Sequence, residues 1–247
     1  MVQNNLIFDF GFHRGNDSDF YLEKGFHVVA LEADPDLVEQ GVKRFAKEIE
    51  DGRLTLIHKA VGNEGGETTF YVHPTKKDWS SCLRELAESD GSAVQAITVE
   101  QTSLLELCSS YGVPRYLKVD IEGHDVFVAR QLSELDVQPA FVSFESGKRH
   151  YAELFCWLWA AGYRSFQLVN QANHVDRRPD ETNTKTEGQA IDYSFSPYSS
   201  GFFGDDLPED RWLTLNQALT RHIKYNEMKT ADNQELGLGW LDIHARL

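Results

Sequence analysis

Ionisable side chains stand at alternate positions in one short stretch of the chain, Lys118-Val-Asp120-Ile-Glu122-Gly-His124. An apolar, strand-like run leads into this stretch, so these side chains should gather where that strand ends. Glu145 closes a later strand-like run and is expected at the same sheet edge. Carboxylates and an imidazole at one place are candidate general bases. The alternative is structural, because Lys118 shares a strand face with Asp120 and could pair with Asp120 or Glu145.

A glycine-bearing turn follows the first apolar run of the chain: Asp9-Phe-Gly11-Phe-His13-Arg-Gly15. Glycine admits positive φ and lets a backbone approach a ligand closely, and the helix start after the turn offers free N–H groups. Any tight strand-to-helix turn favours glycine, so the motif alone is a weak signal. We take Asp9, Gly11 and Gly15 as candidate cofactor-binding residues.

Glu32 closes the apolar run 27–32 and strengthens the case for a cofactor. An acidic side chain at this place can accept both hydroxyl protons of a ribose, and the alternative is a surface carboxylate. Asp34 is a further candidate for contact with the cofactor. A dinucleotide fingerprint needs a second glycine where His13 stands, because a side chain there blocks the diphosphate. S-adenosylmethionine carries no phosphate, so these residues favour it over NAD.

Short strands and helices must position these residues. We expect core strands over residues 6–10, 27–32, 54–59, 115–120, 140–144 and 164–169. We expect helices over residues 17–24, 35–48, 102–111, 124–132 and 151–161. Asp17 or Ser18 is the expected cap of the first helix. Extra strands are expected over residues 65–72 and 94–99, where the alternation is interrupted.

Apolar strands of this kind are buried on both faces, which indicates a parallel sheet. Right-handed crossovers then place the carboxyl ends of the strands along one edge, where ligands bind. The pattern predicts an α/β fold: a doubly wound, mostly parallel, Rossmann-like sheet with inserted extra strands.

A polar segment with glycine and proline follows the last expected strand, from residue 170 to about 210. Such a loop is a lid or substrate-binding segment, or else disordered. We expect one domain over residues 1–247, with a core over about 5–170 and a lid-like C-terminal extension over 171–247. The aromatic residues of this segment either stack on a substrate ring or pack as a lid. They are Tyr193, Phe195, Tyr198, Phe202 and Phe203.

The amino-acid composition limits which partners the protein can bind and where it can be located. The net charge is −15, so a nucleic acid or an anionic membrane is a poor partner. No apolar run approaches the ~20 residues that cross a bilayer, and no signal peptide is evident, so we expect a cytoplasmic protein. The cysteines Cys82, Cys108 and Cys156 form no CxxC pair, which argues against a disulfide framework or structural zinc. The oligomeric state is open, and a homo-oligomer is one alternative.

Several blocks of the sequence resemble the FkbM family of methyltransferases over about residues 6–170. They are Phe8–Gly15, Phe20–Gly25, Val28–Pro35, Ala60–Gly62, Ser80-Ser81 and Leu117–Gly123. The Lys-x-Asp-x-Glu-Gly spacing of the last block is the most specific. The blocks Ser200–Pro208 and Trp240–Ala245 resemble a subset of the family. One departure is Phe12-His13, where many members have Ala-Asn, which leaves open whether position 13 also touches substrate.

This resemblance implies a class I methyltransferase fold, S-adenosylmethionine as methyl donor and a hydroxyl acceptor on a small molecule, sugar or natural product. An alcohol must lose its proton when it is methylated, so a base or a metal is useful. The candidate catalytic residues are Asp120, Glu122, His124 and His13. The candidate substrate-binding residues are Ser81, Glu145 and Asn170.

A divalent metal held by Asp120 and Glu145 is conceivable, but two carboxylates are too few to predict one. Two other classes of function share this pattern. An NAD-dependent oxidoreductase would use the same sheet and the same acidic ribose ligand, and a non-catalytic module could retain the cofactor fold. The missing middle glycine disfavours the first, and retention of the carboxylates argues against the second.

Overall fold

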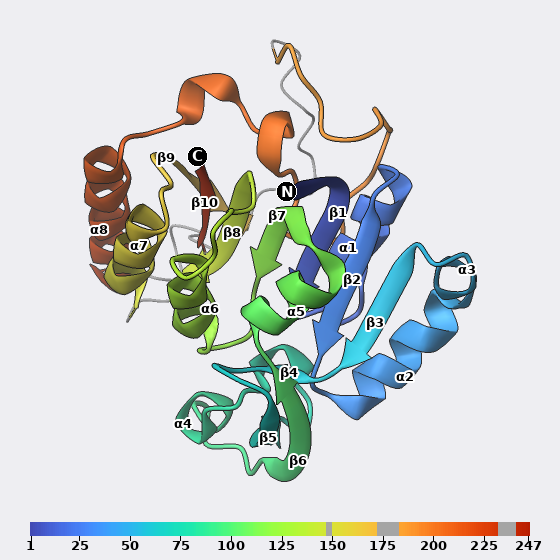
Figure 1. The fold of residues 1–247 in the computed structure, drawn as a ribbon. Helices are drawn as coiled ribbons and strands as arrows, with labels where there is room; N and C mark the ends of the chain where they lie inside the picture. The colour runs from blue at the N-terminus through green and yellow to red at the C-terminus, as the bar shows by residue number, and fades with distance from the viewer. Residues whose placement is uncertain (147–149, 172–182, 232–240) are drawn as a thin grey trace.

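The computed structural model describes residues 1–146, 150–171, 183–231 and 241–247 (Figure 1). A sheet of seven strands forms its centre, in the order β3-β2-β1-β7-β8-β10-β9. The strands are β1 (Val2–Phe10), β2 (His27–Glu32), β3 (Leu54–His58), β7 (Val113–Val119), β8 (Phe141–Ser146), β9 (Ser165–Asn170) and β10 (Leu241–Arg246). The pairs among β3, β2, β1, β7 and β8 are parallel, and β10 runs antiparallel to β8 and β9. This mostly parallel sheet between helices confirms the expected α/β, doubly wound, Rossmann-like fold.

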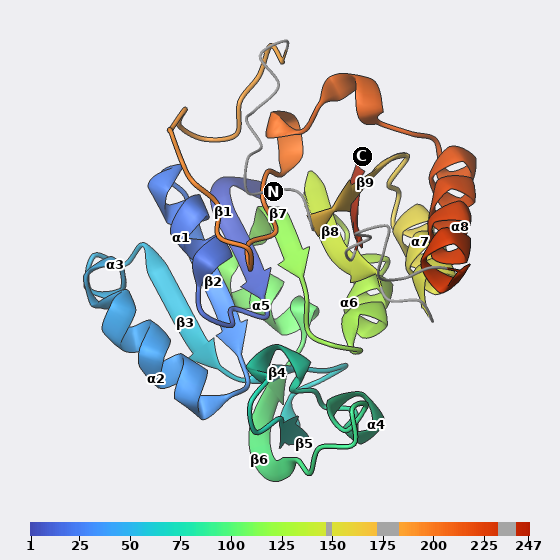
Figure 2. The same cartoon turned by 180° about the vertical axis from the view of Figure 1, so that it is seen from behind.

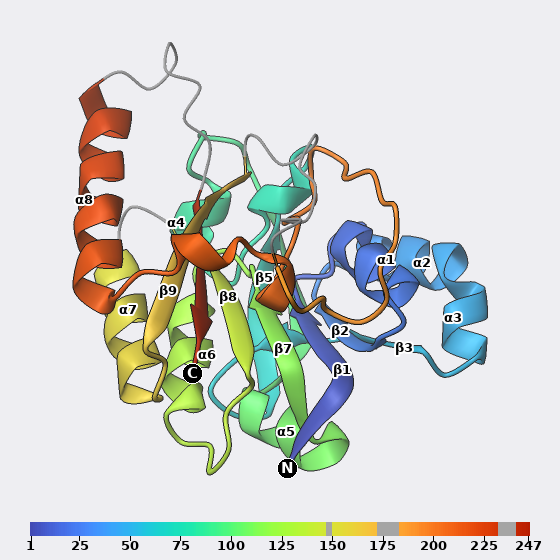
Figure 3. The ribbon, with the colours of Figure 1, turned by 90° about the horizontal axis from the view of Figure 1, so that it is seen from above.

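Helices cover both faces of the sheet. They are α1 (Asn16–Glu23), α2 (Pro35–Arg44), α3 (Ala46–Glu50), α5 (Leu104–Tyr111), α6 (Asp125–Leu132), α7 (Tyr151–Ala160) and α8 (Leu215–Ala231). Strand alternation divides the core, because Phe8 and Phe10 pack toward α5, α6 and α7 while Ile7 packs toward α1. Figure 3 shows α8 beside α7 near β9. No helix in these described ranges is long and apolar enough to cross a membrane.

An insertion between β3 and α5, residues 60–102, lies at the carboxyl-end edge of the large sheet (Figure 1). It contains β4 (Ala60–Val61), β5 (Gly66–Val72), the 3-10 turn η1 (Lys77–Trp79), α4 (Arg84–Ala87) and β6 (Gln95–Thr102). Its strands form a separate sheet in the order β4-β6-β5. The extra strands expected from the sequence are therefore confirmed, and they lie over the carboxyl-end edge, where open α/β sheets generally bind ligands.

Two local expectations were wrong. The stretch expected as one helix to residue 48 forms α2 and α3, with a break at the buried Phe45. Neither Asp17 nor Ser18 caps α1, because Gly15 occupies the N-cap with no side-chain hydrogen bond. The two side chains turn to tertiary partners instead, Ser200 for Asp17 and Asp9 for Ser18.

The segment 183–214 crosses in front of β1 and β7 on the face that carries α1 (Figure 2). It contains the 3-10 turns η3 (Gly204–Asp206) and η4 (Glu209–Arg211). Aromatic rings attach it to α1: Tyr193, Phe195, Phe202 and Phe203 all contact the ring of Phe20. Phe203 also stacks on Tyr116 of β7 at 4.4 Å. These rings therefore pack in the core, and Tyr198, which is exposed, is the member of the aromatic set that lines the cavity described below.

Candidate active site

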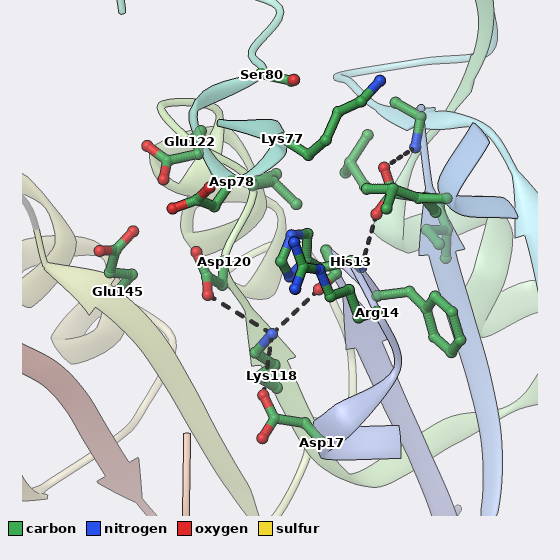
Figure 4. A pocket seen from close by; sticks show the side chains of 18 of the residues that line it. His13, Arg14, Asp17, Lys77, Asp78, Ser80, Lys118, Asp120, Glu122 and Glu145 are labelled. Carbon is green, nitrogen blue, oxygen red and sulfur yellow. Dashed lines mark hydrogen bonds and ion pairs between the residues drawn. The ribbon is translucent and has the colours of Figure 1, made fainter. Parts of the chain in front are cut away.

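A cavity of about 400 Å³ opens at the carboxyl ends of β1, β2 and β7, a volume typical of small-molecule sites. Figure 4 shows the polar side chains that point into it. The insertion 60–102 contributes Phe70, Trp79 and Ser80 to the walls of the cavity. The segment 183–214 contributes Tyr198, Ser199 and Ser200. The strand ends expected to meet therefore do meet, and two segments distant in sequence enclose them.

Glu32, the last residue of β2, lines this cavity and is held by main-chain donors. Its Oε2 accepts the backbone N–H of His13 at 2.7 Å, and its Oε1 accepts those of Ala33 and Asp34 at 2.9 and 2.8 Å. Burial raises the pKa of Glu32 to about 7, while these N–H donors act in the opposite direction. A carboxylate has about four acceptor directions, so three backbone partners leave one for a ligand. The contact of Glu32 with the two hydroxyls of a ribose stays a prediction.

The glycines of the turn hold positive φ, 90° at Gly11 and 74° at Gly15. A Cβ on Gly11 would lie 1.8 Å from the carbonyl oxygen of Asp120, so glycine is required for the chain to pass β7 at this point. A Cβ on Gly15 would meet the rings of Phe12 and Phe45 at 2.5 and 2.6 Å. Gly11 lines the cavity, whereas Gly15 faces these rings and shapes the turn from behind.

Asp9 and Asp34 lie behind the cavity wall rather than in it. The Oδ2 of Asp9 accepts the hydroxyl of Ser18 at 2.6 Å, and its Oδ1 lies 3.4 Å from Nζ of Lys118. Burial raises the pKa of Asp9 to about 6, although the positive charge of Lys118 acts to lower this pKa. Asp34 caps α2 and accepts Nζ of Lys77 at 2.8 Å. Each of these carboxylates thus supports a lysine that does line the cavity.

Lys118 lies at the cavity floor with only 5% of its side chain exposed. Its Nζ donates to the carbonyl of Gly11 at 3.2 Å and lies 3.4 Å from a carboxylate oxygen of Asp9. It also lies 3.4 and 3.7 Å from carboxylate oxygens of Asp17 and Asp120 (Figure 4). Burial acts to lower the pKa of Lys118, but these carboxylates outweigh it and hold the pKa well above its ordinary value. A permanent positive charge therefore stands beside Asp120.

Asp120, Glu122 and Glu145 each bring one carboxylate oxygen within 4.8 Å of the others (Figure 4). Burial raises the pKa of Glu122 and of Glu145 well above its usual range, and the charge of Asp120 adds to the effect. Lys118 pairs with Asp120 and, among the described residues, not with Glu145, which decides between the two expected ion pairs. Oxygen ligands of this kind suit magnesium, and acidic groups also gather in proteins without an ion.

The loop that carries Glu122 is held in a strained conformation, with φ 52° at this non-glycine residue. The hydroxyl of Ser81 donates to its carbonyl at 2.5 Å, and the carboxylate of Asp125 accepts the N–H of Gly123 at 2.9 Å. Ser81 is fully buried in this role and is not among the residues that line the cavity, whereas its neighbour Ser80 is.

Both candidate histidines line the cavity. Nδ1 of His124 lies 3.0 Å from the carbonyl of Val61 and must donate to it, so in the neutral ring Nε2 is the acceptor atom. Burial and the neighbouring Arg14 lower the pKa of His13, which favours the neutral ring. Asn170 ends β9 and is not among the residues that line the cavity.

A sequence profile of the Methyltransferase FkbM domain matches residues 9–165. The chain belongs to the FkbM methyltransferase family. The matched range includes Glu32, Asp120 and Glu145, and it ends before the segment 183–214 that completes the cavity.

Solved structures add similarity at low identity. Methyltransferase FkbM from Methylobacillus flagellatus KT is similar over 69% of this chain and 41% of its own, with 16% identity and a TM-score of 0.45. Precorrin-6y C5,15-methyltransferase from Geobacter metallireducens GS-15 covers 69% of both chains at 11% identity and a TM-score of 0.40. Phosphoethanolamine N-methyltransferase 2 from Haemonchus contortus, solved with S-adenosyl-L-methionine, covers 100% of this chain and 49% of its own at 10% identity and a TM-score of 0.40.

The match spans 41% of the FkbM structure from Methylobacillus flagellatus, well under two thirds of its length. No protein of curated function matches this chain.

Sequence reasoning missed several residues of this FkbM site. Asp17 was taken as a helix cap, and Lys77 and Arg14 were not singled out, although all of them line the cavity. The block Ser200–Pro208 carried a signal through its likeness to a subset of the FkbM family, but nothing in it indicated that Ser200 contacts Asp17. Trp240 of the last block lies outside the described residues.

Proposed function

We propose that this protein is an S-adenosylmethionine-dependent O-methyltransferase that acts on a hydroxyl of a small molecule, a sugar or a natural product. Family membership supports methyl transfer as the class of reaction. The observation that carries the proposal is the presence in one cavity of Glu32, suited to a ribose, and Asp120, suited to remove a proton. The NAD-dependent alternative and the non-catalytic alternative lack a comparable observation.

The residues around Glu32 fit an adenosine. Oε2 of Glu32 has an acceptor direction left for a ribose hydroxyl. Apolar side chains also line this cavity and offer contacts to a flat base, among them Ala33, Leu37 and Phe70. We therefore assign the cofactor to the Glu32 side of the cavity and the acceptor to the side of Asp120.

S-adenosylmethionine, when bound, supplies a methyl group already activated on a sulfonium. The remaining task of the protein is to align the acceptor and to take its proton, and we assign the proton to Asp120. Lys118, whose ammonium lies 3.7 Å from a carboxylate oxygen of Asp120, places a positive charge beside this proposed base. Burial raises the pKa values of Glu122 and Glu145, and their carboxyl groups can form hydrogen bonds that orient the acceptor.

His124 and His13 remain candidates for contact with the acceptor. In the neutral ring of His124, Nε2 is an acceptor atom, and the lowered pKa of His13 favours its neutral form. The single domain over residues 1–247, the cytoplasmic location and the lack of nucleic-acid or membrane partners stay predictions of the sequence.

Methyl transfer from labelled S-adenosylmethionine to a panel of sugars and alcohols tests the proposal. We expect an alkali-stable methyl ether from the wild type, and a turnover about 10²–10⁴-fold lower for Asp120→Asn. Asp51→Asn, an exposed residue at the end of α3, is the matched control and should keep wild-type turnover. Wild-type turnover in Asp120→Asn would remove the assigned base, and a methylated amine or carbon as product would remove O-methylation.

A further inference from the structure

Ser200 connects the cavity wall to α1 through hydrogen bonds to Asp17. Its backbone N–H donates to Oδ1 of Asp17 at 2.7 Å, and its hydroxyl donates to Oδ2 at 2.9 Å. Both residues are buried, with 8% of Ser200 and 6% of Asp17 exposed. Since the preceding residues Tyr198 and Ser199 also line the cavity, this carboxylate sets the position of a wall built from the distant segment 183–214 (Figure 2).

The same carboxylate faces the lysine at the cavity floor. Oδ2 of Asp17 lies 3.4 Å from Nζ of Lys118, and that Nζ lies 3.7 Å from Oδ2 of Asp120 (Figure 4). Asp9 and the carbonyl of Gly11 complete the oxygens around the ammonium. An ammonium held among several oxygens rests where their attractions balance, so loss of one carboxylate moves it toward the others. The distance from Lys118 to Asp120 therefore depends on Asp17.

We propose that Asp17 is a positioning residue that couples the wall segment to the reacting carboxylate, because it seats Ser200 and holds Lys118 in place beside Asp120. This rests on the proposed function, in which Asp120 takes the acceptor's proton. A misplacement of about 1 Å at a reacting centre costs about 10²-fold in rate, so a small shift of Lys118 is enough to matter. Cofactor binding is spared, since Glu32 is held by the backbone of the glycine turn and of its own strand end.

Three variants separate this role from general stabilisation. Asp17→Asn keeps the shape and removes the charge, and we expect kcat to fall at least about tenfold. Ser200→Ala removes one hydrogen bond and keeps the backbone one, so about a fivefold fall is expected. Tyr163→Phe is the matched control, because it also removes one hydrogen bond of a buried hydroxyl, to the carbonyl of Pro139 at 2.9 Å, but Tyr163 does not line the cavity. We expect its kcat to stay at the wild-type value, and all three variants to bind S-adenosylhomocysteine with the wild-type Kd.

Amide hydrogen exchange supplies a readout that needs no acceptor. In Asp17→Asn, exchange in residues 193–203 should rise about tenfold or more, while exchange in β5 and β6 stays at the wild-type rate. If the wild type methylates no hydroxyl, the proposed function fails. The exchange measurement still tests whether Asp17 holds Ser200 and the segment 183–214 in place. Wild-type exchange in Asp17→Asn, or faster exchange with wild-type kcat, would overturn the coupling. A uniform rise across the chain would reduce Asp17 to a stabilising residue.

Discussion

The backbone N–H of His13 donates to Oε2 of Glu32 at 2.7 Å and so joins the glycine turn to the end of β2. The main chain makes this contact, so it does not depend on which side chain stands at position 13. The backbone of His13 is nevertheless unusual, with φ 51°. Histidine and asparagine tolerate this region better than most residues do, which accounts for their exchange at this place between this chain and many FkbM members.

Binding of S-adenosylhomocysteine should strengthen as the pH rises through about 7, the raised pKa of Glu32. The ionised carboxylate accepts the ribose hydroxyl, so a proton on Glu32 competes with the ligand. We expect Kd to fall about tenfold from pH 6 to pH 8 and to level off above that range, as measured by isothermal titration calorimetry. Glu32→Gln should bind weakly with a flat pH profile. An unchanging wild-type Kd would contradict the assignment of Glu32 to the cofactor.

Position 13 should separate backbone from side-chain effects. His13→Asn should retain the stability of the wild type and its Kd for S-adenosylhomocysteine, because asparagine accepts positive φ and the N–H to Glu32 remains. His13→Val should lose about 1–2 kcal/mol of unfolding free energy, since a β-branched residue is strained there. Urea denaturation measures both variants. Equal stability of the two would show that φ at this position is not a constraint.

Replacing Gly11 with alanine should destabilise the protein more than the same change at Gly52. Both glycines have positive φ, 90° and 71°, so both variants carry a conformational cost of about 1–2 kcal/mol. At Gly11 the new Cβ would also lie 1.8 Å from the carbonyl of Asp120, whereas at Gly52 nothing lies within 4 Å. The steric conflict should add about 1–3 kcal/mol in urea denaturation and lower turnover through Asp120. Equal losses in the two variants would argue against this close approach.

The buried ion pair of Lys24 and Asp206 should contribute strongly to stability, because it joins the end of α1 to the segment 183–214. Nζ and Oδ2 lie 2.7 Å apart, with 2% and 1% of the two side chains exposed. Lys24→Met leaves a buried carboxylate without its partner and should cost about 3–5 kcal/mol of unfolding free energy. Removing both charges should cost less than the sum of the single changes, which a double-mutant cycle measures.

The exposed pair of Lys43 and Glu39 is the control for that cycle, with 72% and 68% of the side chains exposed. Lys43→Met should leave the urea midpoint unchanged, because solvent screens such a pair. A loss at Lys24 no larger than the loss at Lys43 would show that burial does not set the strength of the Lys24 pair.

The local sequence pattern predicted secondary structure correctly where the residues of a segment themselves determine its structure. The strand β2 has the bounds expected for it, His27–Glu32, because apolar residues on both faces of a short run indicate a strand buried between helices. The strand β10 escaped notice because Asp242 and His244 interrupt its apolar pattern. Both are buried, with 4% and 2% exposed, and the strand is held by pairing with β8 and β9.

The sequence by itself determined the fold class and the residues that meet at the sheet edge. Short apolar strands alternating with helices leave few topologies, and all of these bring Glu32, Asp120 and Glu145 to one side. Only the tertiary structure decided the partners of those residues. Whether Lys118 pairs with Asp120 or Glu145, and whether Asp17 caps a helix or holds Ser200, depends on differences of a few ångströms. Such distances are set by packing between segments far apart in the chain, which local sequence patterns do not encode.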